Sequence, residues 1–420
     1  MRVWYSGGTR GEFGSVGCGC RLFPAMLLSV LCSVLCCGSA SGYGEGVQRV
    51  RVATFNCSLN RNEAGLLSSE LAGGELGQAR QIARILRRVR PDIVLLNEFD
   101  FAADGLAAAA FCREYLEAEG AWSSEPPLVL GERFQASVNT GEPSGRDFDQ
   151  DGRMGGPADA IGFGRFPGQY GMLVLSRFPI QRDRSRTFQR VLWRDMPNAL
   201  LPMNPKTNQP WYSAADLEVL RLSSKSHWDV SVQLPGLELH VLASHPTPPA
   251  FDGAEDRNGC RNHDEIRFWA DYLGAETSGW IRDDAGRSGG LEQGAAFVIL
   301  GDLNADPFDG GSRPGAIQQL LDHPRVNAEL PGRSAGAGEA AILQQGRNRE
   351  QRGNAEEDTA DFSDSSVGNL RVDYVLPSRG LRRVGGGVFW PLKGEAGADL
   401  IECSDHRLVW VDLEFGDSDH

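Results

Sequence analysis

The chain has 420 residues, of which 41% are hydrophobic and 8% aromatic. This composition can bury a large core, which excludes wholesale disorder, and the length suits one large domain or two ordinary ones. The formal net charge of −14 argues against a protein that holds nucleic acid through a broad basic face. A metal-dependent nuclease, which reaches phosphate through its cation, stays compatible with that charge.

The start of the chain has the pattern of a secretory signal peptide over residues 1–40. Basic residues precede the apolar run 22–37, and the small residues 38–40 offer a cleavage site. The run is short for a membrane span. We therefore expect a secreted or periplasmic protein, with an uncleaved membrane anchor as the second alternative.

After the leader, residues 41–48 are predicted to be a linker and residues 49–416 one folded domain. The cysteines that remain are Cys57, Cys112, Cys260 and Cys403. Their even number permits one or two disulfides in an oxidising compartment, and the sequence does not define the connectivity.

Two predicted strands near the start of the domain end in polar residues. Residues 49–56 alternate as a strand does, and Asn56 ends them. After an amphipathic helix over residues 79–89, the buried strand 92–97 delivers Glu98 at its carboxyl end. By itself such an asparagine is typical of a turn. The glutamate either faces solvent or is held by a cation.

Residues 131–169 are rich in Gly, Asp, Pro and Arg, which predicts a long ordered loop. Inside it Asp147, Asp149 and Asp151 have the spacing of the first half of a calcium-binding loop. The glutamate expected at the end of such a loop is missing, because Ala158 stands there. A structural Ca²⁺ site and a solvated acidic turn are the two alternatives.

Four further strands are predicted, over residues 171–176, 217–223, 228–234 and 237–244. The short connections between the last three indicate an antiparallel meander. His245 follows the last strand; a lone histidine is typical of a hydrogen-bonded structural residue, but this one again stands at a strand end. Lys225 and His227 are candidates for contact with a substrate phosphate, or equally residues of a solvated strand end.

The next polar segment contains a predicted helix start. Asn262 and Glu265 have the spacing of a capping box, so Asn262 is expected to cap the helix. Arg257, Arg261 and His263 then lie near that helix start, where backbone N–H groups favour an anion. These three residues are further candidates for binding substrate phosphate.

A short buried strand over residues 297–300 leads into Asp302 and Asn304. Two residues that are two apart on an extended chain point to the same side. Open α/β sheets bind their ligands at this end of the strands. The alternative to a ligand site is a strand that runs into an Asx-rich turn.

The last part of the domain contains three more candidate residues. Residues 332–357 lack periodicity and are predicted to form a mobile loop. Asp373 lies among apolar residues of the predicted strand 369–376, and a buried aspartate needs a partner. Asp405 and His406 precede the final strand.

The order and contexts of these polar residues resemble the endonuclease/exonuclease/phosphatase superfamily. The resemblance is carried by Asn56, Glu98, His245, Asp302, Asn304, Asp373, Asp405 and His406. It implies an α/β fold in one domain, a four-layer α/β/β/α sandwich with two packed mixed β-sheets.

The resemblance also implies roles for these residues. Glu98 would be the principal metal ligand, with Asp405 and Asn56 completing the site, and hard oxygen ligands favour Mg²⁺ or Mn²⁺. His406 would pair with Asp373. Either Asp302 or His406 takes the proton from the attacking water. We favour Asp302 for that role, with Asn304 orienting the water and with His245 and His406 on the phosphoryl oxygens.

The sequence thus predicts a secreted hydrolase of phosphate esters that depends on a divalent metal. Its substrate is a small molecule, a lipid head group or a nucleic acid, and we expect a monomer without a stable protein partner. An extracellular endonuclease resembling deoxyribonucleases and a non-catalytic binding protein on the same fold are the alternatives.

Overall fold

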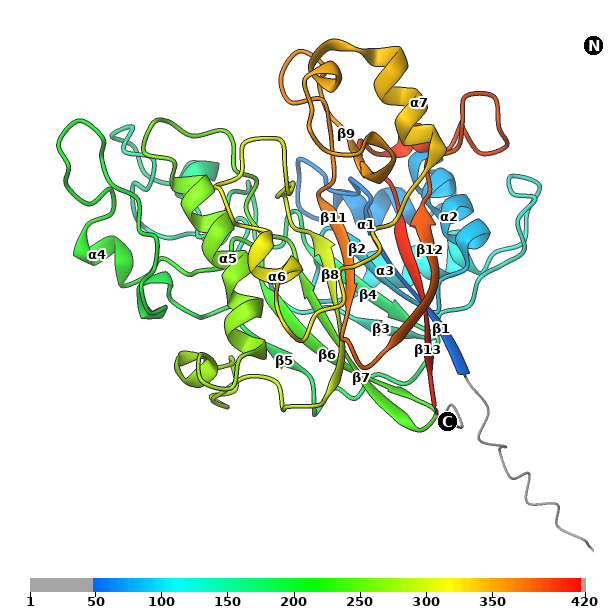
Figure 1. The fold of residues 1–420 in the computed structure, drawn as a ribbon, viewed down its shortest axis with the longest axis horizontal. Coiled ribbons are helices and arrows are strands. Elements are labelled where there is room, and N and C mark those ends of the chain that lie inside the picture. The colour runs from blue at the N-terminus through cyan, green and yellow to red at the C-terminus, as the bar shows by residue number, and fades with distance from the viewer. Residues whose placement is uncertain (1–47, 417–420) are drawn as a thin grey trace, which may run out of the picture. The chain divides into compact units, whose positions relative to one another are not determined.

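The computed structural model describes residues 48–416, which form two β-sheets packed face to face (Figure 1). The first sheet has the order β12 (Arg382–Val388), β13 (Val409–Phe415), β1 (Gln48–Asn56), β2 (Ile93–Asn97), β4 (Met172–Ser176) and β3 (Glu132–Phe134). The second has the order β11 (Asp373–Pro377), β8 (Ala296–Asp302), β7 (Leu237–Ser244), β6 (His227–Leu234) and β5 (Arg186–Thr187). β1 pairs with β2 in parallel, β7 pairs with β8 in parallel, and the other neighbours are antiparallel, so both sheets are mixed.

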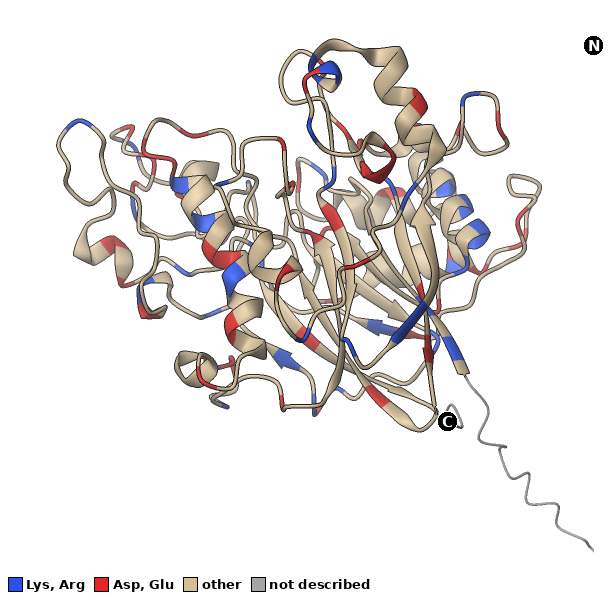
Figure 2. Cartoon of the chain, in the orientation of Figure 1, with Lys and Arg blue, Asp and Glu red and all other residues tan. Residues whose placement is uncertain are grey.

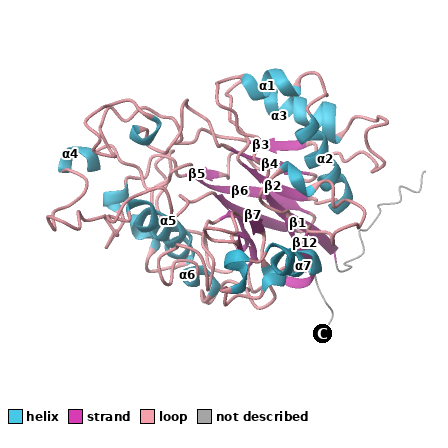
Figure 3. Ribbon diagram, turned by 90° about the horizontal axis from the view of Figure 1, so that it is seen from above, coloured by secondary structure: helices cyan, strands magenta, loops and turns pink. Residues whose placement is uncertain are grey.

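Helices cover the outer faces of the two sheets. On one side lie α1 (Leu66–Leu71), α2 (Gly77–Val89) and α3 (Leu106–Ala110), and on the other α5 (Arg257–Leu273) and α6 (Gln318–Leu321), as Figure 3 shows from above. The short α4 (Ala214–Leu217) lies in a connection. The predicted single-domain sandwich of two mixed sheets with outer helices is confirmed.

Three apolar clusters fill the spaces between these layers, and strand alternation assigns residues to them. Val50 and Val52 of β1 lie in the cluster between the two sheets, whereas Ala53 and Phe55 pack with the helices outside the first sheet. A third cluster joins the second sheet to α5. A fully buried Val or Phe side chain stabilises the folded state by about 1.5–3 kcal/mol. Since β1 has buried side chains on both of its faces, it stabilises both interfaces.

The segment predicted to be a mobile loop, residues 332–357, instead carries α7 (Ala335–Gln344) and two short 3₁₀ turns. Its alanines favour a helix, and Ser334 caps it by accepting a hydrogen bond from the backbone of Gly336. Only small side chains are buried on this helix. The periodic apolar face that would have marked it in the sequence is therefore missing.

The α7 segment continues into a small hairpin of β9 (Ala360–Asp361) and β10 (Asn369–Leu370). Together they form a lobe, drawn at the top of Figure 1. Ala360 makes a single antiparallel bridge with His406, so the lobe is attached beside the entry to β13. The predicted strand 217–223 was wrong, because α4 ends at Leu217 and only Arg221 forms a bridge, to Leu192.

The predicted signal peptide and linker lie outside the described residues, apart from residue 48, which begins β1. Among residues 48–416 no helix is long and apolar enough to span a bilayer. The four cysteines of this part are buried free thiols, so the permitted disulfides do not form.

Candidate active site

The predicted polar residues meet at one edge of the sandwich. Parallel pairing brings the carboxyl ends of β1 and β2 together, and likewise those of β7 and β8. The antiparallel β11 starts at the same level, since Asp373 is directly opposite Asp302 in the ladder. The edge therefore collects Asn56, Glu98, His245, Asp302, Asn304, Asp373, Asp405 and His406.

Asp302 lies at the centre of this group and is almost fully buried. Its Oδ2 accepts a hydrogen bond from Asn56 Nδ2 at 3.0 Å. The same oxygen lies 3.4 Å from His245 Nε2 and 3.6 Å from His406 Nε2. Its Oδ1 accepts the backbone N–H of Asn304 at 2.9 Å. One carboxylate thus faces both imidazoles while its other oxygen is fixed by the main chain.

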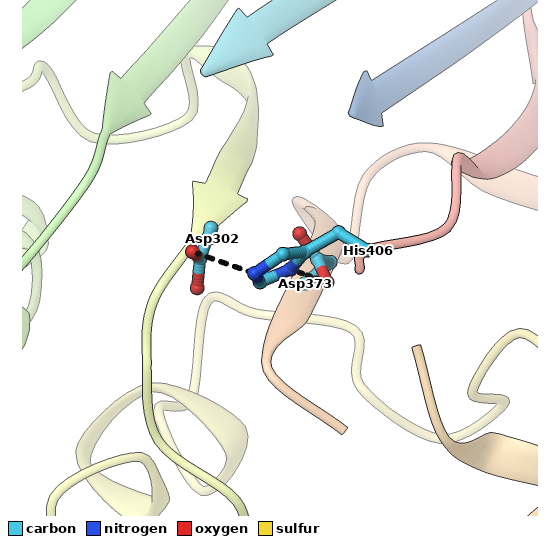
Figure 4. A group of neighbouring side chains, drawn as sticks. All are labelled: Asp302, Asp373 and His406. Carbon is cyan, nitrogen blue, oxygen red and sulfur yellow. Dashed lines mark hydrogen bonds and ion pairs between the residues drawn. The ribbon is translucent and has the colours of Figure 1, made fainter. Parts of the chain in front are cut away.

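His406 is held by a second aspartate on its far side (Figure 4). Its Nδ1 lies 2.9 Å from Asp373 Oδ2, which also accepts a hydrogen bond from Thr359 Oγ1 at 2.8 Å. This pairing is the one that the resemblance implied. It fixes the ring so that Nε2 points to Asp302.

The charges of these groups shift each other's pKa values. Burial alone would lower the pKa of His406, but the carboxylates of Asp373 and Asp302 outweigh it and raise that pKa well above its usual range. Burial would raise the pKa of Asp302, but His406 and His245 outweigh it and lower that pKa. These opposite shifts favour an ionised Asp302 beside a protonated His406.

Glu98 adopts a left-handed backbone conformation, with φ of 58°, directly after β2. Its Oε1 accepts a hydrogen bond from Asn56 Nδ2 at 3.2 Å, and its Oε2 accepts one from Asn60 Nδ2 at 2.7 Å. The amide nitrogen of Asn56 therefore bridges the carboxylates of Glu98 and Asp302. The carboxylates of Glu98 and Asp405 and the amide oxygen of Asn56 are hard oxygen donors, the type of ligand that Mg²⁺ or Mn²⁺ prefers.

Asp405, the other predicted metal ligand, is exposed at the rim of the same group. Its Oδ1 lies 3.5 Å from Ser58 Oγ. The neighbouring Ser404 donates a hydrogen bond from Oγ to the carbonyl of Asn56 at 2.8 Å, which keeps this segment against β1. Asp405, Asn56 and Glu98 are thus on the same side of the molecule, as a shared cation requires.

Two of the predicted phosphate-binding residues have partners within the protein. His227 Nδ1 lies 2.6 Å from Ser223 Oγ and its Nε2 lies 2.9 Å from the carbonyl of Glu265, so neither ring nitrogen is free. The phosphate role predicted for His227 was therefore wrong. Arg261 donates from Nε to the carbonyl of Leu222 at 2.9 Å and from Nη2 to three further backbone carbonyls, so its phosphate role stays a prediction for Nη1 alone.

Arg257 and His263 also have other partners. Arg257 pairs with Glu255 and lies over the Trp211 ring, 5.7 Å from its centroid. His263 Nδ1 lies 3.2 Å from Asp264 Oδ1. The predicted cap at Asn262 was wrong, because α5 begins at Arg257 and Asn262 lies inside it. Arg257 is thus at the helix start, and the phosphate role of Arg257 and His263 stays a prediction.

The three carboxylates of the predicted calcium loop lie close together, as their spacing in the sequence indicated. Oxygens of Asp147, Asp149 and Asp151 all lie within 4.8 Å of one another. They also accept hydrogen bonds from the loop's own main chain, such as the one from Gly152 N to Asp147 Oδ2 at 3.0 Å. A solvated turn therefore explains this geometry too, and the Ca²⁺ site stays a prediction.

Asn97, which was not among the predicted site residues, links the two sheets beneath the site. Its Oδ1 accepts the backbone N–H of Asp302 at 3.2 Å, and its Nδ2 donates to the carbonyl of Ser244 at 3.3 Å. Asn97 is fully buried at the end of an apolar strand. The need of a buried amide for partners was the signal that could have identified it.

We expect Asn97→Leu to lower kcat by about tenfold to a hundredfold, because the sheet edge that presents Asp302 loses its anchor. The main-chain groups left without partners should also lower the free energy of unfolding by about 1–3 kcal/mol. Turnover and urea denaturation measure the two effects. Asn369→Leu, which removes another buried amide that contacts Gln344 in the lobe, is the matched control. An equal loss of turnover in both variants would assign the effect to stability alone.

The chain is similar to several solved structures and matches one protein family. Among solved structures, the chain is similar to an endonuclease/exonuclease/phosphatase from Beutenbergia cavernae, with 19% identity over 88% of this chain and 72% of that chain and a TM-score of 0.46. It is also similar to a protein of the same family from Leptotrichia buccalis, with 13% identity, coverage of 87% and 100%, and a TM-score of 0.43. A third is sphingomyelinase C from Streptomyces griseocarneus, with 17% identity, coverage of 87% and 99%, and a TM-score of 0.42.

These likenesses do not bear on the substrate, and no curated protein matches the sequence. The sequence does match the Endonuclease/Exonuclease/phosphatase family over residues 53–406, a span that runs from β1 to His406. The chain therefore belongs to this family, whose members are hydrolases acting on phosphate esters.

Proposed function

We propose that the chain is a secreted phosphoesterase that depends on a divalent metal and hydrolyses a small or lipid-borne phosphate ester with water. The observation that carries the proposal is the position of Asp302, whose Oδ2 faces His245, His406 and Asn56. The leader pattern of residues 1–40 supports secretion.

Glu98, with Asn56 and Asp405, would hold the cation, which when bound neutralises charge on the phosphoryl and leaving oxygens. Asp302 takes a proton from the attacking water, because its Oδ2 is free of main-chain bonds and the carboxylate stays ionised beside His406 and His245. His406 Nδ1 is committed to Asp373. His406 therefore acts as a donor to a phosphoryl oxygen through Nε2, together with His245.

Asn304 has a different task from the one expected. Its Nδ2 donates to the carbonyl of Pro246 at 3.1 Å, and its backbone N–H binds Asp302. It therefore positions the aspartate and the segment that follows His245. We propose this positioning role for Asn304 in place of direct contact with the water.

The charge pattern favours a small or lipid-borne ester over a long nucleic acid. Figure 2 shows acidic and basic residues interspersed along the chain, and the net charge is −14. A nucleic-acid groove instead gathers cations along the path of the phosphates.

The test is a panel of esters with the mature chain, each with Mg²⁺ and with EDTA. The panel contains bis-p-nitrophenyl phosphate, p-nitrophenyl phosphate, inositol phosphates, sphingomyelin vesicles and supercoiled plasmid. We expect turnover of at least one small or lipid ester, with a loss of about a hundredfold or more in EDTA. Nicking of plasmid alone would instead favour the extracellular nuclease. No turnover of any ester would favour a binding protein.

A further inference from the structure

The main chain at Lys225 is held from several directions. The backbone N–H of Ser224 donates to Glu265 Oε1 at 2.5 Å, and the carbonyl of Lys225 accepts the N–H of Asn139 at 2.8 Å. The other oxygen of Glu265 accepts the backbone N–H of Thr247 at 2.6 Å. A single buried carboxylate thus ties the segment that carries Lys225 to the segment that follows His245.

Close packing on the other side leaves this segment little freedom. A Cβ added at Gly162 would lie 1.9 Å from the carbonyl oxygen of Ser224, so only glycine fits there. Gly162 itself donates its N–H to the carbonyl of Asn139 at 3.0 Å. The position of Lys225 is therefore set by the fold rather than by its own side chain.

The Lys225 side chain is buried, with 7% of the residue exposed. Within residues 48–416 its ammonium has neither a hydrogen bond nor an ion pair. Burial lowers the pKa of Lys225, and the carboxylates of Glu265, Glu98 and Asp302 oppose that shift. Lys225 in turn acts with burial to lower the pKa of His245. The ladder of β6 and β7 pairs His227 with Ser244, so Lys225, which precedes β6, and His245, which follows β7, lie at the same end of these two strands.

An ammonium that is largely buried and lacks an ion pair is held less favourably than a paired one, because part of its hydration is lost without a compensating charge. Within the described part of the chain, Lys225 Nζ is not among the fully buried polar atoms without a partner, so it keeps some access to solvent. A structural cation in this chain is bound differently. Arg186 donates from Nε to Asp283 at 2.8 Å and from Nη1 to the carbonyl of Gly289 at 2.9 Å. Lys225 has acids nearby but donates to none of them, which leaves its protons available to an incoming oxyanion.

We propose that Lys225 binds a non-bridging phosphoryl oxygen of the substrate and is a further catalytic residue. This rests on the proposed function. Preorganised donors aimed at phosphoryl oxygens stabilise the charge that develops there. Lys225 adds an ammonium to the imidazole donors His245 and His406, and Glu265 is the positioning residue that aligns its segment with that of His245.

The test measures the binding of inorganic phosphate to the full chain by calorimetry, with Mg²⁺ present. We expect saturable binding by the wild type and an affinity at least about tenfold lower for Lys225→Met and Lys225→Gln, as loss of a charge-assisted hydrogen bond predicts. Lys225→Arg, which keeps the charge, should retain part of the affinity for phosphate. Lys206→Met, which removes an exposed lysine far from the strand ends in sequence, is the control and should bind as the wild type does.

Thermal unfolding separates this role from a structural one. Removing a largely buried ammonium that has no ion pair should leave the free energy of unfolding of Lys225→Met unchanged or raise it, whereas loss of a structural ion pair would lower it. If Lys225→Met does not fold, the measurement is made on Lys225→Gln. Failure of both variants to fold would contradict the proposal. Phosphate affinity that is unchanged in the variants, or absent in the wild type, overturns it. Phosphate binding through Lys225 without turnover of any ester would overturn the proposed function and leave this inference intact.

Discussion

Asp302→Asn should lower kcat/KM by about a thousandfold or more, the scale expected when a proton acceptor and a charge at the reacting centre are lost together. Asparagine keeps the size of the side chain but removes the negative charge that faces His245 and His406 at 3.4 and 3.6 Å. Steady-state turnover of the best ester from the panel measures the effect.

The matched control is Asp229→Asn. Asp229 is also a buried aspartate beside a histidine, with its Oδ1 2.7 Å from His240 Nδ1, but its Oδ2 accepts a hydrogen bond from the Tyr272 hydroxyl rather than facing the imidazoles of the site. We expect that variant to lose stability and keep most of its turnover. Near-normal turnover in Asp302→Asn would remove the carboxylate from the reaction.

Glu98→Gln is expected to lower kcat/KM by about a hundredfold at moderate Mg²⁺, because the side chain loses the charge that a divalent cation requires. The amide can still accept a hydrogen bond from Asn60, so the loop should keep its conformation. Higher concentrations of Mg²⁺ should restore part of the activity. A titration of turnover against Mg²⁺ gives the shift in apparent metal affinity.

Glu70→Gln provides the comparison for this variant. Glu70 is a glutamate of the same part of the chain but pairs with Arg61, with its Oε2 2.5 Å from Arg61 Nε. Its replacement should leave the dependence on Mg²⁺ unchanged. An equal dependence on Mg²⁺ in Glu98→Gln and the wild type would contradict a metal-binding role for Glu98.

The sequence was most informative where a polar residue ended a buried strand. Asn56, Glu98, His245 and Asp302 were identified in this way, and parallel pairing explains why they meet. The partner of Asp373 was implied by the resemblance, and the structure places it at His406 Nδ1.

Partners chosen by distant segments could not be predicted in the same way. His227 was predicted to be accessible, but the carbonyl of Glu265, 38 positions later, occupies its Nε2. Asn262 matched a capping pattern, yet its Nδ2 donates to the carbonyls of Thr247 and Leu303 from inside α5. Local sequence does not reveal which main-chain groups will surround a polar side chain after folding.

The division of the site between two sheets has a practical consequence. Asn56 and Glu98 come from the first sheet, whereas His245 and Asp302 follow strands of the second, and the chain passes from one to the other between β4 and β5. A break in that connection would yield two fragments, each with an incomplete set of reacting groups. Turnover after mixing them would then report that the halves had reassembled, which makes the enzyme suited to fragment complementation.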